Sequence, residues 1–139
     1  MRVVAIWTAC AAAALMTTGC GGPPTGTVSG QVTIDGKPLD KGVISFAPMD
    51  SNGGSPITAN VENGKYHVQA QAGNKRVMIS APVVTGRRKE SDAPNAQMIE
   101  LTEERLPEKY NVRSELTFEV KSGSNTKDWQ VESKPGRKQ

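Results

Sequence analysis

Apolar and polar residues alternate in short runs along most of the chain. In residues 28–34, Val28, Val32 and Ile34 share one side and polar residues hold most of the other, which is the period-two pattern of a half-buried β-strand. Six further runs have a similar character and lie at 43–48, 57–61, 65–70, 76–80, 116–120 and 129–131. Seven short strands separated by turns predict an all-β fold, either a sandwich or a barrel.

Turn-forming residues separate these runs. The dipeptides Asp35-Gly36 and Asn63-Gly64 are typical of tight β-hairpins, because glycine permits positive φ. Residues 50–56 (DSNGGSP) are also dense in turn formers. They begin like a calcium-binding loop, but Val61 holds the position of that loop's final Glu, so we expect a plain turn there.

The bulkiest apolar residues of the runs are the expected core. Most of them fall on the inward side of a predicted strand, where a small sandwich needs volume. They are Leu39, Phe46, Tyr66, Phe118 and Trp129.

The stretch between the fifth and sixth runs departs from the pattern. Residues 82–111 are too long for a hairpin connection, and we expect a long loop there. Its polar part, 86–96, is expected to be mobile, and 97–106 is expected to form a helical turn or an irregular edge strand. Met98, Leu101 and Leu106 would anchor this second part to the sheet.

The tip of that loop carries a short basic cluster, Arg87-Arg88-Lys89, followed directly by acidic residues. Such a mixed cluster indicates a solvated loop tip more than a patch for phosphate or anionic lipid. Binding surfaces are often loops held on a rigid scaffold, so we expect a partner to touch the protein here.

The N-terminal segment has the layout of a secretory signal peptide, with Arg2, an apolar run at 3–16 and a junction of small residues. Cys20 follows that junction, and the segment resembles a bacterial lipoprotein signal, in which such a Cys is lipidated and begins the mature chain. Thr17 stands where that signal usually has Leu. The resemblance implies a signal peptide at 1–19, lipid attachment at Cys20 and a flexible tether over 20–26.

Three alternatives exist for this segment: cleavage without a lipid, an uncleaved membrane helix and a buried core helix. The apolar run would span about 21 Å at roughly 1.5 Å per residue, which is short of the roughly 30 Å hydrocarbon core of a bilayer. The run also lacks a polar face. Export is therefore the expectation, followed by a domain at 27–133 and a disordered tail at 134–139.

Removal of the signal would change the charge and the thiol content. Cys10 would be lost, so Cys20 would be the remaining cysteine and no intramolecular disulfide is expected. Loss of Arg2 would leave 16 basic against 14 acidic side chains, a balance of +2. A nearly neutral chain without a concentrated basic stripe argues against nucleic-acid binding.

Several short motifs, in order, resemble the carboxypeptidase regulatory-like domain. They are 30–39 (GQVTIDGKPL), 42–48 (GVISFAP), 63–68 (NGKYHV) and 77–79 (VMI). The later 106–111 (LPEKYN) and 114–117 (SELT) are similar to the ending of short bacterial envelope lipoproteins that carry this domain. The resemblance implies a seven-stranded, transthyretin-like or immunoglobulin-like Greek-key sandwich with no peptidase activity of its own.

The residues offer little for catalysis. His67 is the single histidine, and it alternates away from Tyr66 and Val68 toward solvent. A zinc site needs two or three His or carboxylate ligands in a set spacing, and a nucleophilic serine needs its own base. Glu103-Glu104 are adjacent carboxylates in a charged stretch, for which solvation is the simplest role. We expect no enzyme activity, no metal and no cofactor.

These expectations combine into a non-catalytic β-sandwich, exported and lipid-anchored to a bacterial envelope membrane on its periplasmic or outer face. Its partners would be the membrane, through Cys20, and an envelope protein or glycan, giving a structural or protein-binding role. A carbohydrate-binding accessory module is the alternative. Tyr110 is then the one aromatic ring expected to be free to contact a sugar.

Overall fold

A computed structural model describes residues 22–50 and 54–136. The expected signal peptide, the lipid-attachment residue Cys20 and the middle of the 50–56 turn lie outside the described residues.

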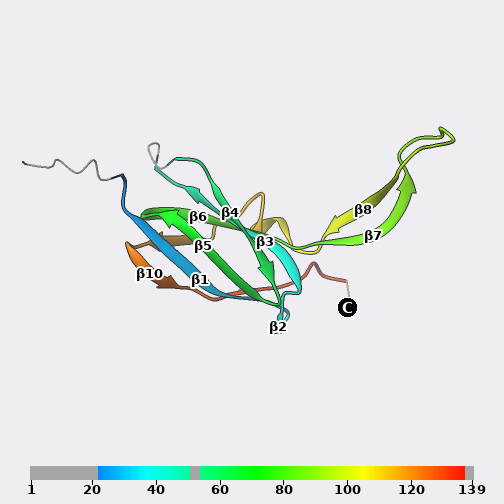
Figure 1. Ribbon diagram of the computed structural model, residues 1–139. Coiled ribbons are helices and arrows are strands. Elements are labelled where there is room, and N and C mark those ends of the chain that lie inside the picture. Colours follow the sequence, from blue (N-terminus) through cyan, green and yellow to red (C-terminus); the bar gives the residue numbers. More distant parts are fainter. Residues whose placement is uncertain (1–21, 51–53, 137–139) are drawn as a thin grey trace, which may run out of the picture.

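The described part is all-β, with a single short 3₁₀ turn (Figure 1). Its elements in chain order are β1 (Thr25–Ile34), β2 (Lys37–Pro38), β3 (Lys41–Pro48), β4 (Ile57–Glu62), β5 (Lys65–Gln71), β6 (Gly73–Ser80), β7 (Pro82–Lys89), β8 (Met98–Glu104), η1 (Glu108–Tyr110), β9 (Thr117–Val120), β10 (Gly123–Thr126) and β11 (Trp129–Val131).

Nine strands form one curled sheet, which we call the body. Its order is β10-β1-β5-β4-β3-β6-β9, and β2 and β11 also pair with β1. Neighbours are antiparallel except where β1 runs parallel to β10 and to β11. β4 and β5 pair at one position, Glu62 with Lys65, beside the tight turn that joins them. The sheet therefore opens between these two strands.

Two glycines of β1 let the C-terminal part of the chain approach its backbone closely. A Cβ on Gly26 would lie 2.1 Å from the carbonyl oxygen of Lys121, and one on Gly30 would lie 1.9 Å from that of Lys127. Glycine is the residue that permits such a close approach of two backbones. The approach of Lys121 to Gly26 places the segment after β9 against β1, and the sheet curls around its interior.

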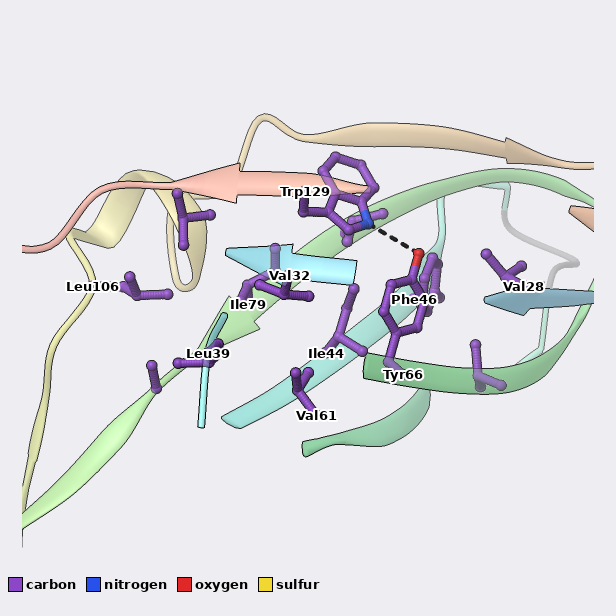
Figure 2. Close-up of a cluster of buried hydrophobic side chains, with 14 of the residues drawn as sticks. Val28, Val32, Leu39, Ile44, Phe46, Val61, Tyr66, Ile79, Leu106 and Trp129 are labelled. Carbon is purple, nitrogen blue, oxygen red and sulfur yellow. Dashed lines mark hydrogen bonds between the residues drawn. The ribbon is translucent and has the colours of Figure 1, made fainter. Parts of the chain in front are cut away.

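The core fills that interior with the inward residues of the alternating strands (Figure 2). Of the five expected bulky core residues, four are buried: Leu39 is 0 %, Phe46 1 %, Tyr66 4 % and Trp129 7 % exposed. Phe118 is partly buried and packs against them. Burying one large apolar side chain contributes about 1.5–3 kcal/mol, so these positions dominate the stability of the body.

All seven predicted strands are present, and both predicted hairpin turns have the expected backbone. Asp35 and Gly36 have φ of 51° and 80°, and Asn63 and Gly64 have 50° and 76°. Positive φ at both central residues suits the right-handed twist of the flanking strands. Strand β1 starts earlier than expected, because Thr25 and Gly26 pair with Gln71 and Ala70 instead of belonging to the tether.

The expected long loop at 82–111 is wrong for most of its length, although the edge strand expected as one alternative for 97–106 is present as β8. β7 and β8 pair along seven positions, from Pro82 opposite Glu104 to Lys89 opposite Met98, with one irregularity between Val84 and Gly86. The resulting hairpin projects from the body (Figure 1). A two-stranded ribbon without a buried face needs no apolar–polar alternation, so the sequence pattern gave no sign of it. We call residues 82–104 the arm.

Two expected anchors of this region are also wrong. Met98 is 58 % and Leu101 39 % exposed, because both lie on the arm away from the core. Leu106 alone of the three is buried, at 0 % exposure. Tyr110, expected to be free, is partly buried and packs against the core from η1.

Candidate functional site

The arm concentrates exposed apolar surface. Three of the five exposed large hydrophobic side chains among the described residues belong to it: Val84 at 52 %, Met98 at 58 % and Leu101 at 39 % exposure. Soluble proteins usually expose such residues singly, whereas here three of them belong to one hairpin. The remaining two, Met49 and Val112, lie elsewhere on the chain.

The register gives the arm apolar side chains on both faces. Val83, Ile99 and Leu101 share one face, and Val84 and Met98 share the other, because successive residues of a strand point to opposite sides. Leu101 stands opposite Gly86, which has no side chain to cover it. Isolated two-stranded hairpins are marginally stable in water, so such a ribbon gains from a surface that covers it.

The arm is fixed to the body at its base by the carboxylate of Glu104. One oxygen of Glu104 accepts the backbone N–H groups of Ala81 at 2.8 Å and Leu106 at 2.9 Å. The other accepts the hydroxyl of Ser80. The carboxylate thus ties the entry into β7 to the exit from β8. Hydrogen bonds to an ionised acceptor are stronger than neutral ones, which makes this joint well defined.

Neighbouring contacts reinforce the base. The carbonyl oxygen of Ala81 accepts the backbone N–H of Arg105 at 3.3 Å and its guanidinium Nε–H at 3.2 Å. The backbone N–H of Lys134 in turn donates to the carbonyl oxygen of Arg105 at 2.9 Å. Lys134 was expected to begin a disordered tail, but this bond holds it beside the arm. The arm therefore leaves the body at a fixed joint.

Further out, the arm is held by the hydrogen bonds between its two strands and by an ion pair. Arg87 and Glu100 meet at 2.7 Å, with side chains 66 % and 49 % exposed. Exposed pairs of this kind contribute about 0–1 kcal/mol, so the outer half of the arm is much weaker than its base. The stretch 86–96, expected to be mobile as a whole, divides into β7 up to Lys89 and the turn that follows.

A second surface feature is a polar groove of about 920 Å³ along β1, β4 and β5, where the sheet opens. Its lining includes His67, Gln31, Asn60 and Asp128. The carboxylate of Asp128 accepts the backbone N–H of Gln31 at 2.7 Å. His67 is exposed as expected, and within the described residues no hydrogen bond orients its ring.

Tyr66 and Trp129 are buried beneath the groove. The Tyr66 hydroxyl donates to the carbonyl oxygen of Lys127 at 2.7 Å and accepts the indole N–H of Trp129 at 3.2 Å (Figure 2). Burial raises the pKa of Tyr66 to about 12, and the bond from Trp129 opposes that shift in part. The pair therefore holds the chain crossing at Gly30 in place and leaves neither ring exposed.

The described residues contain no group of three or more His, Cys, Asp or Glu side chains placed to hold a metal ion. In the same part of the chain, no helix has the length and hydropathy to cross a bilayer. Glu103 and Glu104, expected to be two solvated carboxylates, have separate environments, because Glu104 clamps the arm while Glu103 is exposed on its opposite face.

Comparison with known proteins adds one likeness. No family model matches the chain, and no curated protein matches it significantly. Among solved structures, it is similar to a DUF3823 family protein from Parabacteroides merdae, a bacterial β-rich protein, with 15 % sequence identity and a TM-score of 0.43. The match covers 82 % of this chain and 48 % of that one, so the chain spans about half the length of the protein it resembles.

Proposed function

We propose that this chain is a non-catalytic, lipid-anchored β-sandwich of a bacterial cell envelope, and that it binds a protein partner through the arm. The observation that carries the proposal is the arm itself: a ribbon with apolar side chains on both faces, joined to the body by the Glu104 clamp. Protein partners recognise such ribbons by adding a strand to an open edge or by covering an apolar face.

The position of the arm suits this role. The described chain begins at Gly22, two residues after Cys20, and the start of β1 lies at the end of the body away from the arm (Figure 1). A lipid on Cys20 would hold that end at the membrane. The arm would then point away from the bilayer, toward proteins of the surrounding compartment.

The finer fold assignment is part of the same proposal. The single pair between β4 and β5 divides the curled sheet into a half around β1 and β5 and a half around β3 and β6. Core residues of both halves, such as Val28 and Ile79, point into the same interior. This division supports a two-layered, transthyretin-like sandwich of the carboxypeptidase regulatory-like class.

Affinity purification from membranes of the native bacterium tests the partner. The arm variant would carry Val84→Ser, Met98→Ser and Leu101→Ser, all at exposed positions where the body should be unaffected. Val112→Ser, at a residue 78 % exposed but outside the arm, is the matched control. We expect the wild type and the control to recover the same protein, and the arm variant to recover at least tenfold less of it.

Reconstitution with the recovered protein, purified alone, should reproduce that difference in affinity. Equal binding by the arm variant would contradict the arm as the contact surface.

Substitution of Cys20 tests the anchor separately. Several acyl chains at about 0.8 kcal/mol per buried methylene hold a protein firmly on a bilayer, whereas one chain is marginal. We expect the wild type to incorporate a fatty-acid probe and to enter the detergent phase, and Cys20→Ser to lose both properties. A Cys20→Ser protein that is processed at the same bond and stays on membranes would overturn the lipoprotein assignment.

Glycan binding is the second candidate, because the polar groove offers amide, carboxylate and imidazole groups that suit sugar hydroxyls. Against it, none of the aromatic side chains among the described residues is exposed enough to form a stacking platform. The test is retention on purified cell-wall polysaccharide. If the wild type is retained and Asn60→Ala is not, glycan binding is favoured over protein binding through the arm.

A further inference from the structure

Lys75 is the one charged side chain that is buried in the described part of the chain, at 4 % exposure. It lies in β6 and shares the inward side of that strand with Val77 and Ile79, both of which are 0 % exposed. A lysine at such a position is unusual, because charged side chains are almost never fully buried unless they are paired.

Within the described residues Lys75 has no such partner. None of the three ion pairs involves it, and its ammonium makes no hydrogen bond there. An ammonium group has three donors and no acceptor, so it requires an anion or several oxygens when it leaves water. The other buried polar residue, Ser114, is satisfied, because its hydroxyl donates to the carbonyl oxygen of Val77.

Lys75 lines a pocket of about 200 Å³ between the first residues of β4 and the last residues of β5. Phe46 and Ala70 line it as buried apolar groups, at 1 % and 2 % exposure. The remaining lining residues, Ser55, Ile57 and Gln71, are partly or fully exposed and form its mouth. The pocket therefore combines a cation that has no partner among the described residues, an apolar wall and a polar rim.

We propose that this pocket binds a carboxylate with a short apolar tail. The carboxylate would accept hydrogen bonds from the Lys75 ammonium, and the tail would pack on Phe46 and Ala70. Pockets for drug-sized ligands usually measure about 300–1,000 Å³, so this smaller space suits a ligand with few carbons. The carboxylate can belong to a free aliphatic acid or to a short peptide segment that ends in the pocket.

Titration of the whole protein with sodium butyrate, followed by backbone amide NMR, tests the proposal. At constant ionic strength, we expect saturable shifts at Ala70, Gln71 and Lys75. Butyramide has the same tail without the charge and should bind at least tenfold more weakly. Lys75→Met should abolish the butyrate shifts, and Lys121→Met, at an exposed lysine of the body, should leave them unchanged.

A second titration distinguishes the two sources of the carboxylate. It compares acetyl-glycyl-valine as the free acid with the same peptide as its amide. Binding of butyrate identifies a site for free acids, and binding of the peptide acid alone identifies a site for chain ends. Equal midpoints for butyrate and butyramide, butyrate shifts that persist in Lys75→Met, or no saturable shift with either acid would overturn the proposal.

Discussion

The Glu104 clamp makes the strongest prediction about how the arm is held. Glu104→Ala removes the acceptor for the backbone N–H groups of Ala81 and Leu106 and for the Ser80 hydroxyl. Ala81 and Leu106 are both 0 % exposed, so water cannot easily replace the lost carboxylate. The Ser80 hydroxyl is only partly buried and can turn toward solvent.

The size of the expected stability loss follows from the two backbone N–H groups that lose their acceptor. Each buried donor left without an acceptor costs about 1–3 kcal/mol, so the pair sets an expected loss of about 2–6 kcal/mol in the free energy of unfolding. Glu104→Gln should lose less, because its amide oxygen can still accept both N–H groups. The loss in Glu104→Gln relative to the wild type measures the charge-assisted part of the joint.

Urea unfolding of the purified protein, combined with hydrogen exchange, is the assay. Thr102→Ala is the matched control, because Thr102 is exposed on the same face of β8 as Glu104, and surface changes usually stay within about 0.5 kcal/mol. We expect the amides of Ala81 and Leu106 to lose protection in Glu104→Ala. A loss no larger than that of the control, with both amides still protected, would refute the clamp.

Three further predictions concern the core, the pH dependence and the arm. Trp129→Ala should lower the free energy of unfolding by about 3–5 kcal/mol, because the ring is buried against Phe118; a loss under about 1 kcal/mol in urea melts would mean that the ring is not buried. The pKa of Tyr66 is raised to about 12 from the ordinary value of 10, so the native state holds the phenolic proton more tightly than the unfolded state does. The stability from this group is complete below about pH 10 and is lost as the pH rises through about 12, so thermal melts over that range should fall less steeply for Tyr66→Phe than for the wild type; equal slopes would contradict this. Trypsin should cut the folded protein first near Lys89, where the outer arm has no buried face, and mass spectrometry that found the first cut at Lys41 in the body would contradict this.

The body could be predicted from the sequence because its strands have one buried and one exposed side. Alternation located Val28, Tyr66 and Trp129 correctly in the core, and the Asp-Gly and Asn-Gly steps located both tight turns. β10 was missed, because Gly123–Thr126 has no apolar residue and pairs at the edge of the sheet.

The candidate sites were harder to predict for a related reason. The arm carries no periodic pattern, and its clamp depends on one carboxylate reaching Ser80, 24 positions away. The sequence pattern does not single out Lys75, because the fifth run begins at Arg76. Extending that run by one residue places a lysine on the same side as Val77 and Ile79, where a charged side chain is unusual.

The pairing of β1 with β10 and β11 has a consequence for how the chain folds. Gln31 in β1 bonds to Asp128, which lies 97 residues further along the sequence. Contacts between such distant residues form slowly, typically in milliseconds to seconds, because a long loop must close before they are gained. The first strand stays open on one side until the last strands have been made. A chain that ends before residue 123 would therefore expose an unpaired β1 edge and tend to aggregate, so completion of β1 depends on residues 123–131.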